Sequence, residues 1–432
     1  MALARLDLRG APADRASLER LLPRPVDEQA RSSEAVAAIL AEVRSDGDAA
    51  LARLTARFDG VVPEALAVPA EECTAALERI PSELRAALEV AAERIRAYHA
   101  HEADRPAGPY AADGVTVRHL VRPVTRAGCY APGGRARYPS TVLMCAVPAR
   151  VAGVDEVVLC VPPGPDGRID DATLAAAAVA GVDEVYAVGG AQAVAAMAFG
   201  TETIGAVDVI VGPGNRYVAE AKRQVSGVVG VASAFAGPSE VVVVAGPTTP
   251  PDLAAIDLVV QAEHGPDGSA WLLTWSEEVA DAVDAEVAAI VASSPRRADL
   301  EATLGGGGYA VLVDGPEQAC AVSDVIAPEH LELLVDDAED LLEHIHAAGA
   351  VFLGIDAPAS IGDYLAGPNH VLPTNRTARF SSALRVDDFR KHIHAVTVGP
   401  EAVAELGPHV VVLAETEGLP AHAESVRRRW AR

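Results

Sequence analysis

The sequence predicts an α/β fold built around two parallel sheets. From about residue 115 onward, short β-branched or apolar runs alternate with Ala-rich helical segments, and this alternation occurs in two successive series. Strands and helices that alternate in this way form parallel sheets covered by helices. Composition agrees, because 50% of the 432 residues are hydrophobic but only 4% are aromatic. That balance suits close helix-on-sheet packing better than an aromatic-cored β-sandwich.

Residues 25–105 form a predicted helical part that carries no visible chemistry. Apolar side chains recur there at helical spacing, for example at Val36, Ile39, Leu40 and Val43. The first α/β series follows this part. Its strands are predicted at Val115–Val124, Val157–Val161, Val185–Val188 and Val207–Val211.

The second series completes the predicted core. Its helices are expected at Pro250–His264 and Val279–Ala292, and its strands at Val241–Ala245, Trp271–Thr274, Ala310–Val313, Leu331–Val335 and Ala350–Leu353. Gly305–Gly308 is expected to be a flexible joint. Two such units imply a cleft, and ligands in these sheets collect at the carboxyl ends of the strands.

We therefore expect five segments along the chain. They are an N-terminal arm (1–24), a helical part packed on the first domain (25–114), two Rossmann-like domains (115–238 and 239–382) and a helical C-terminal tail (383–432).

The charge balance excludes several kinds of partner. The chain has 35 Lys and Arg against 61 Asp and Glu, a formal charge of −26, which would repel nucleic-acid phosphates and anionic lipids. The basic residues at 427–429 and 432 fit a solvated helix end. Five scattered cysteines lack CxxC spacing, the N-terminus lacks a signal-peptide core, and no long apolar run occurs. We expect a cytoplasmic protein with no nucleic-acid or membrane partner.

No GxGxxG motif follows a strand, so a standard dinucleotide fingerprint is absent. Two glycine turns nevertheless follow strands and precede helices, at 189–192 (GGAQ) and 212–215 (GPGN). Glycine permits close backbone approach, and a helix N-terminus favours phosphate. A third turn offers Tyr130 as a contact for a flat ring. Each turn alone fits an ordinary tight turn as well as a ligand loop.

Gln261 and His264 lie three residues apart near the end of an apolar helix, so they share one face of its last turn. A carboxamide oxygen and an imidazole form a plausible half-site for a divalent metal, which needs further ligands from elsewhere. The alternative is a solvated surface histidine.

Glu329 and His330 follow Pro328, which suits the first turn of a short helix. The positive end of a helix favours a neutral imidazole, the form that a general base near pH 7 requires. Glu329 could act as a second acid/base group on a different proton. A capping carboxylate beside an incidental histidine is the alternative.

Two further polar clusters occur toward the C-terminus. Residues 362–374 are rich in polar groups and turn residues, and there Asp363 could bind a metal and His370 a substrate. Glu417 and His422 lie on the predicted tail. An exposed pair of this kind would ordinarily be unremarkable.

Taken together, these segments resemble the histidinol dehydrogenase family. The likeness runs from about residue 115 to the C-terminus, and the helical N-terminal part fits in length. The matching strings are YAPGGR (130–135), YPS (138–140), VGGAQA (188–193), VGPGN (211–215), AGPSE (236–240), QAEH (261–264), APEHLE (327–332), GDY (362–364), AGPNHVLPT (366–374) and EGLPAH (417–422).

The resemblance implies a homodimeric enzyme that oxidises L-histidinol through L-histidinal to L-histidine, with two NAD⁺ and one Zn²⁺ per subunit. It implies Gln261, His264, Asp363 and His422 as zinc ligands, the last from the partner subunit. Glu329 and His330 would be the acid/base pair. The implied substrate residues are Ser239, Gln261, His264, His330, Asp363, His370, Glu417 and His422, and those for NAD⁺ are Tyr130, Gln192 and Asn215.

A few positions depart from the usual family pattern. Gly265 and Ser233 each replace an Asp, Asn375-Arg376 replace a Gly-Gly, and Cys145 stands where Asn is common. None of them is an implied ligand or acid/base residue.

Two alternatives to histidinol oxidation remain open from the sequence. One is a paralogous zinc and NAD dehydrogenase of another small polar alcohol, such as a sulfonated diol. The retention of Asp363-Tyr364, His370 and Glu417 favours an imidazole-bearing substrate instead. The other is a non-catalytic scaffold, in which Glu329 and His330 would have no evident use.

Overall fold

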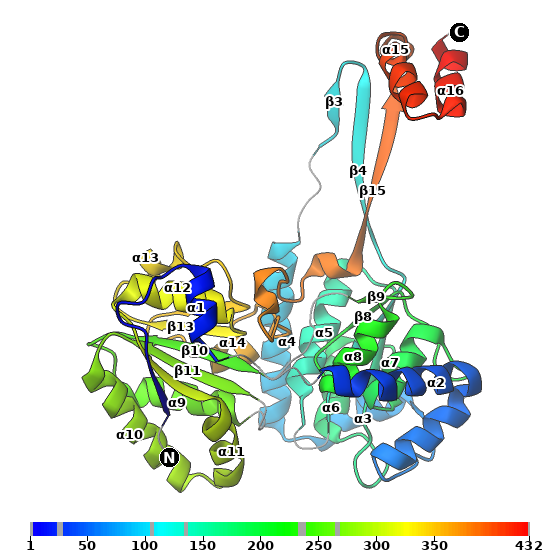
Figure 1. Cartoon of the computed structure of the whole chain (residues 1–432). Coiled ribbons are helices and arrows are strands. Elements are labelled where there is room, and N and C mark those ends of the chain that lie inside the picture. The colour runs from blue at the N-terminus through cyan, green and yellow to red at the C-terminus, as the bar shows by residue number, and fades with distance from the viewer. Residues whose placement is uncertain are drawn as a thin grey trace. The chain divides into compact units, whose positions relative to one another are not determined.

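The computed structural model describes residues 3–23, 29–103, 108–133, 137–231, 239–263 and 268–430. The chain divides into two units, Met1–Glu102 with Thr125–Phe389 (unit 1) and Ala103–Val124 with Arg390–Arg432 (unit 2). Figure 1 labels the elements of both units in chain order. Among the described residues, every helix is too short or too polar to cross a membrane.

The first sheet of unit 1 has the strand order β2-β7-β6-β5-β8-β9. Its strands are β2 (Ala67–Val68), β5 (Arg126–Tyr130), β6 (Glu156–Val161), β7 (Glu184–Ala187), β8 (Val209–Val211) and β9 (Gly230–Val231). All pairs are parallel except the short β2–β7 pair. The predicted strands at 157–161, 185–188 and 207–211 are thus confirmed within one or two residues.

Helices cover the first sheet. One core cluster joins it to α2 (Gln29–Phe58), α7 (Gly190–Phe199) and α8 (Arg216–Val225), with Leu51, Met197 and Ile210 among its buried members. The helices α3 (Ala70–Arg79), α4 (Ser82–Glu102), α5 (Pro139–Ala152) and α6 (Asp171–Ala180) pack on one another. The helical scaffold predicted from the N-terminal periodicity therefore packs against this sheet.

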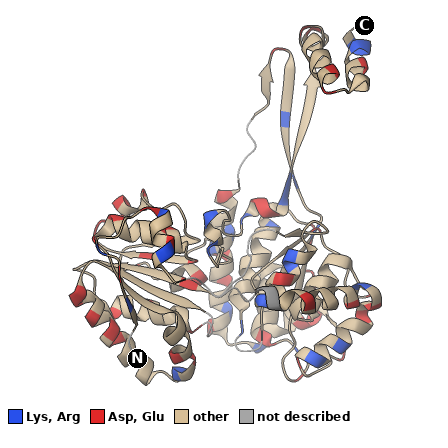
Figure 2. Cartoon of the chain, in the orientation of Figure 1, with Lys and Arg blue, Asp and Glu red and all other residues tan. Residues whose placement is uncertain are grey.

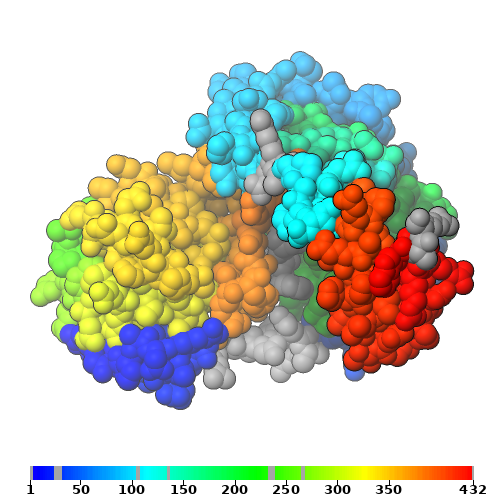
Figure 3. Space-filling model, turned by 90° about the horizontal axis from the view of Figure 1, so that it is seen from above, coloured from blue at the N-terminus to red at the C-terminus, as the bar shows by residue number. Residues whose placement is uncertain are grey.

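The second sheet of unit 1 has the order β1-β12-β11-β10-β13-β14, and every pair is parallel. Its strands are β1 (Ala4–Asp7), β10 (Glu240–Ala245), β11 (Ser269–Thr274), β12 (Gly308–Leu312), β13 (His330–Leu334) and β14 (Ala350–Leu353). All five strands predicted for the second series are present. Sequence reasoning missed β1, by which the N-terminal arm joins the sheet edge; Figure 3 shows this blue segment against the yellow residues of the same unit.

Two core clusters attach helices to the second sheet. One contains side chains of α9 (Pro251–Ala262), α10 (Glu277–Ser293) and α11 (Arg297–Gly307). The other contains side chains of α1 (Arg15–Leu21), α12 (Pro316–Ile326) and α13 (Ala338–Leu342), together with Trp271 of β11, which stacks on Tyr309. Glu277, Glu278 and Asp281 of α10 are exposed. Figure 2 shows acidic positions, in red, along several helices of both sheets.

The glycine run at 305–308 is not a flexible joint. It ends α11 and begins β12 directly. A Cβ atom at Gly307 would lie 2.4 Å from the Gly268 carbonyl oxygen, and one at Gly308 would lie 2.6 Å from that of Leu304. These glycines are needed because the helix and strand pack too closely for larger residues.

Unit 2 contains an antiparallel sheet in the order β15-β4-β3, followed by two helices. Its elements are β3 (Tyr110–Ala112), β4 (Val115–Pro123), β15 (Arg390–Val398), α15 (Pro400–Thr416) and α16 (Pro420–Trp430). The prediction of residues 115–124 as the first strand of a parallel sheet is therefore wrong. The alternation of Val115 and Val117 with Thr116 and Arg118 suits a strand with one solvated face, which antiparallel sheets can have.

The place in the first sheet that was predicted for residues 115–124 is taken by β5. It was missed because Arg-Ala-Gly-Cys-Tyr is short and contains a glycine. The region after residue 383 was expected to be helical, but it contains β15 before its two helices.

The candidate active site

The acid/base candidates lie at the amino edge of the second sheet. Ser239 directly precedes β10, Glu329 directly precedes β13, and His330 is paired in register with Val241. A helix that connects parallel strands runs back toward their amino ends, so Gln261 in the last turn of α9 belongs to the same edge. In this sheet the candidate residues therefore lie at the opposite edge from the carboxyl ends, where ligands were expected to collect.

Glu329 and His330 are both buried, and each contacts different groups. The Glu329 Oε2 atom accepts a hydrogen bond from the Glu240 backbone N–H at 3.2 Å, and the Ser239 side chain also hydrogen-bonds to this carboxylate. The His330 Nδ1 atom lies 3.8 Å from Glu329 Oε2, and its Nε2 atom lies 3.3 Å from Asp363 Oδ1. The two residues thus form one buried acid/base cluster with Asp363.

The helix-end explanation for a neutral His330 is wrong. Ala327, at φ 50°, ends α12, and the chain then enters β13 as extended strand, so His330 does not lie in the first turn of a helix. Burial alone would lower the pKa of His330, but the carboxylates of Glu329 and Asp363 outweigh it and raise the pKa to about 9. Burial also raises the pKa of Glu329.

The loop after α14 (Ala359–Tyr364) connects this cluster to the first sheet. His370 Nδ1 lies 2.8 Å from the Asp363 carbonyl oxygen, and His370 Nε2 lies 3.3 Å from Thr141 Oγ1 near the start of α5. Because α5 follows β5, Thr141 belongs to the carboxyl side of the first sheet. Polar contacts therefore run from that side through His370 and Asp363 to His330.

The donors that the structure describes suit a zinc ion. Gln261 offers a buried amide and Asp363 a largely buried carboxylate, and oxygen and imidazole donors are common zinc ligands. Burial, followed by the charge of Asp363, raises the pKa of the neighbouring half-buried Tyr364. His264 lies outside the described residues, as do Gly265 and Ser233.

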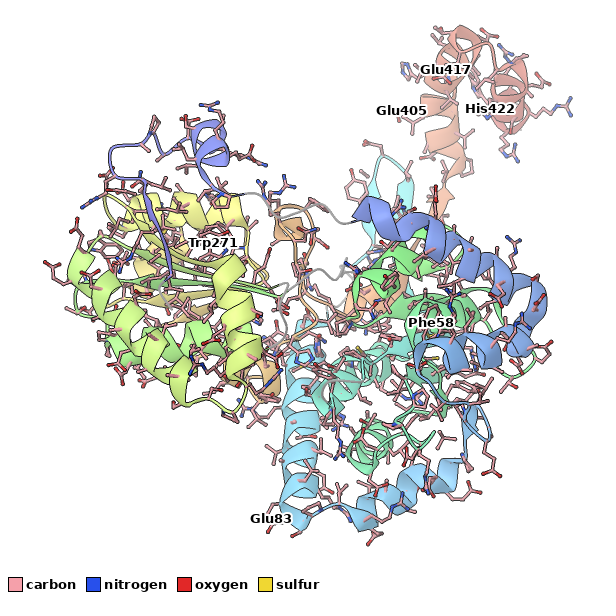
Figure 4. All side chains as sticks on the ribbon, turned by 60° about the horizontal axis from the view of Figure 1, so that its bottom comes forward. Phe58, Glu83, Trp271, Glu405, Glu417 and His422 are labelled. Carbon is pink, nitrogen blue, oxygen red and sulfur yellow. The ribbon has the colours of Figure 1, made fainter. Side chains whose placement is uncertain are left out.

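The remaining two candidates, Glu417 and His422, belong to unit 2. Glu417 ends α15 and His422 lies in the first turn of α16, so a short turn separates them, and both are exposed (Figure 4).

The three dinucleotide candidates lie at the carboxyl edge of the first sheet. Tyr130 ends β5, Gln192 lies in the first turn of α7 after β7, and Asn215 caps α8 after β8. The strand order reverses between β5 and β8, the position at which open α/β sheets bind ligands. This expectation from the sequence therefore agrees with the topology.

Close packing and hydrogen bonds fix the positions of these residues at the edge. A Cβ atom at Gly212 would lie 2.1 Å from the Tyr130 carbonyl oxygen, so only glycine allows this turn. The Tyr130 hydroxyl group accepts a hydrogen bond from the Gly190 N–H at 3.1 Å, and the Asn215 side-chain oxygen caps α8. Gln192 is buried, and its Nε2 atom has no hydrogen-bond partner among the described residues. A buried donor of this kind requires a partner, which a bound cofactor could provide.

Several buried or half-buried polar residues in and around the two candidate sites were not singled out from the sequence. They are Glu240, Asp257, Glu332, Asn369, Thr141 and Lys222. One signal was available: Glu332 interrupts the apolar run His-Leu-Glu-Leu-Leu, and a charged residue inside a buried strand needs a reason.

Comparison with known proteins shows which family this chain belongs to. A family model described as histidinol dehydrogenase matches residues 22–430. The chain is 48% identical over 415 residues to the histidinol dehydrogenase of Parasynechococcus marenigrum, covering 96% of this chain and 95% of that protein. It is 49% identical over 394 residues to that of Pseudomonas syringae pv. tomato, covering 90% and 88% of the two chains.

A solved structure agrees as well. The crystal structure of histidinol dehydrogenase from Elizabethkingia anophelis superposes with a TM-score of 0.93 at 35% sequence identity, and the match covers 99% of this chain and 98% of that one. The α/β class is thereby confirmed, and this chain belongs to the histidinol dehydrogenase family.

Proposed function

We propose that this chain oxidises L-histidinol through L-histidinal to L-histidine in histidine biosynthesis, with NAD⁺ in both oxidations and one zinc ion per subunit. The observation that supports this most is the buried cluster of Glu329, His330 and Asp363 in a member of this family. In it, two acid/base groups lie beside a carboxylate suited to a metal, which is what two successive oxidations at one carbon atom require.

His330 serves the first oxidation in this proposal. Its imidazole, in the neutral form, takes the proton of the substrate hydroxyl group while the carbon atom loses hydride, and an aldehyde results. Because the neighbouring carboxylates outweigh burial and raise the pKa of the ring to about 9, only a small share of the rings is neutral at pH 7, and the first oxidation should quicken as the pH rises toward 9. The ring is buried and held between Glu329 and Asp363, so a substrate bound beside Asp363 lies within its reach.

Glu329 serves the second oxidation. A water molecule must add to the aldehyde, and the Glu329 carboxylate takes the proton that this water loses. The Glu240 N–H and Ser239 fix the orientation of this carboxylate, and burial raises its pKa, which makes it a stronger base than a surface carboxylate. The aldehyde oxygen takes up the proton that His330 carries from the first step, and the resulting hydrate then loses hydride and one hydroxyl proton, the latter to His330, to give the carboxylic acid.

Bound NAD⁺ supplies the hydride acceptor, and bound zinc supplies a cation that orients the amine and imidazole nitrogens of the substrate. Tyr130, Gln192 and Asn215 would hold the dinucleotide. Gln261, His264 and Asp363 would hold the zinc ion together with His422 of the partner subunit. Ser239, His370 and Glu417 would complete the substrate pocket.

A homodimer with shared sites and a cytoplasmic location complete the proposal. All five cysteines are free, and four of them are buried, which suits a reducing compartment. The net charge of −26 disfavours binding to nucleic acids or anionic membranes.

Purified protein with L-histidinol, NAD⁺ and zinc should release two NADH for each histidinol consumed. The count should fall to zero after removal of zinc with a chelator and return when zinc is added. Absence of NADH from the zinc-loaded protein would exclude the proposal. If a sulfonated diol or another alcohol gave a higher kcat/KM than histidinol, the substrate assignment would be overturned.

A further inference from the structure

Glu332 is a fully buried charged residue in the middle of the second sheet. It lies on β13 two residues after His330, and therefore on the same face of the strand. Its Oε1 atom accepts a hydrogen bond from the Ala359 N–H at 2.8 Å. Ala359 is the first residue of α14, whose own N-terminal residue Pro358 makes no side-chain cap. Glu332 therefore caps the helix that carries Asp363.

The Glu332 carboxyl group also contacts another acid. The Oε2 atom is buried and accepts no hydrogen bond from a conventional donor among the described residues. Asp257 of α9 nevertheless hydrogen-bonds to the Glu332 carboxyl group. Two ionised carboxylates can only accept hydrogen bonds, so this contact requires a proton on one of them.

The surroundings favour retention of that proton. Burial, followed by the charge of Asp257, raises the pKa of Glu332 to about 9, although the nearby His330 opposes the shift. Burial also raises the pKa of Asp257. Near neutral pH the pair therefore holds one proton between its two carboxyl groups.

Asp257 lies one helical turn before Gln261 on α9, so the two share a face of that helix. Glu332 thus relates all three elements of the site. It belongs to β13, which carries His330, and it contacts α9, which carries Gln261, and α14, which carries Asp363. We infer that Glu332 is a positioning residue whose carboxyl group joins α9 to α14 and holds Gln261 and Asp363 in place beside His330. This inference rests on the proposed zinc site.

Three variants of the full-length protein test this role. Glu332→Gln keeps an acceptor for the Ala359 N–H and gains an amide donor for Asp257, so it imitates the protonated acid. Glu332→Met has similar length but can make neither bond. Asp257→Leu breaks only the link to α9, and its partly exposed position makes it the safer variant for folding.

The readouts are the zinc dissociation constant from chelator competition, kcat and KM for histidinol, and the melting temperature. Glu332→Met and Asp257→Leu should each weaken zinc binding and lower kcat at least ten-fold. Glu332→Gln should stay within about three-fold of wild type in both.

Gln318→Met is the matched control. Gln318 is also buried under the second sheet, but it hydrogen-bonds the Leu8 and Ala11 carbonyl oxygens and the Asp314 N–H, which are outside the site. It should lower the melting temperature and leave zinc affinity and kcat unchanged.

Two results would overturn the inference. In the first, Glu332→Met and Asp257→Leu have lower melting temperatures but keep the zinc affinity and kcat of wild type. In the second, Glu332→Gln loses as much zinc affinity and kcat as Glu332→Met. A wild-type protein that binds zinc without oxidising histidinol would overturn the proposed substrate only, since the zinc affinities of the variants would still decide the role of Glu332.

Discussion

Glu329 and His330 are adjacent in sequence, yet the fold gives them different partners. The Glu329 carboxylate is held by the Glu240 N–H and Ser239, whereas His330 lies against Asp363. This difference supports two separate proton transfers rather than one shared step. Replacement of one residue should therefore affect the two oxidations unequally.

Glu329→Gln should slow the second oxidation more than the first. The amide oxygen can still accept the Glu240 N–H, so the local structure is kept, but the amide cannot take a proton from water. We expect the oxidation of histidinal to fall by about 10²-fold or more, a typical loss for a general base. Single-turnover NADH formation, started separately from histidinol and from histidinal, measures the two steps. Equal losses in both would contradict separate roles.

We predict that the buried Lys222 makes the free energy of unfolding depend on pH. It is buried in α8, and its ammonium group donates a hydrogen bond to the Gly212 carbonyl oxygen. Burial lowers its pKa from 10.5 to about 8. Between these two values the unfolded chain binds the proton more tightly, so the contribution of Lys222 to the free energy of unfolding rises with pH, by about 1.4 kcal/mol per unit at most.

Lys222→Met removes this contribution. Urea unfolding of both proteins between pH 7.5 and 10.5 should show the stability of wild type rising relative to that of the variant as pH increases. Lys391→Met, at an exposed lysine of β15, is the control and should leave the wild-type pH profile unchanged. Parallel profiles for wild type and Lys222→Met would show that the buried amine keeps its ordinary affinity for protons.

At the scale of elements, the strands were predictable because buried parallel strands are continuous apolar runs. Which edge of the sheet carries the site could not be predicted from the sequence. A sequence pattern such as that around His330 shows where a strand begins, but only the assembled sheet shows that β10, β13 and the end of α9 meet at the amino edge. The roles of Glu332 and Asp257 depend on the same long-range contacts, so no local pattern could supply them.

One departure from the family pattern is explained at this scale. Asn375 and Arg376 replace a Gly-Gly pair, and both adopt positive φ, at 52° and 63°. Glycine adopts such angles at little cost, and asparagine tolerates them better than most residues. The backbone N–H groups of the pair also hydrogen-bond to Glu240, whose own backbone N–H contacts Glu329. The substitution thus keeps the turn that supports the acid/base cluster.

We predict that substrate binding weakens when the loop that carries His370 loses the side chain of Asn369, which anchors it. The buried Asn369 donates a hydrogen bond from its side chain to the Met144 carbonyl oxygen at 2.6 Å and accepts one from the Val371 N–H at 2.9 Å. Asn369→Ala removes both of these hydrogen bonds, which fix the backbone next to His370. The KM for histidinol should rise about ten-fold, equivalent to about 1.4 kcal/mol, with a smaller change in kcat.

Gln224→Ala is a matched control for Asn369→Ala. Its side-chain amide also hydrogen-bonds a backbone carbonyl group, that of Ser33, at 2.9 Å, but on the α2 side of the first sheet. It should leave the KM unchanged. An unchanged KM for Asn369→Ala as well would mean that the loop keeps His370 in place without this anchor.

At the scale of the whole molecule, the proposed zinc ligands are distributed over both units of the chain. Gln261 and Asp363 belong to unit 1, and His422 belongs to unit 2. Unit 2 also exposes large apolar side chains: Val396 of β15 is 60% exposed, and Val412 and Leu413 of α15 are 63% and 64% exposed. Exposed apolar groups of this kind commonly mark a surface that another chain covers. They support a dimer in which unit 2 completes the site of its partner.

Complementation between two inactive variants tests that arrangement. Gln261→Ala and His422→Ala should each lose zinc and activity as homodimers, because every site lacks one ligand. In a mixed dimer, one site lacks both ligands, whereas the other receives Gln261 from one chain and His422 from its partner. An equimolar mixture that exchanges subunits at random should therefore recover about a quarter of wild-type activity, with a matching amount of bound zinc. A Gln261→Ala chain mixed with a Gln261→Ala/His422→Ala chain is the control and should stay inactive. If subunit exchange is verified with differently tagged chains and no activity returns, each site takes all its ligands from a single chain.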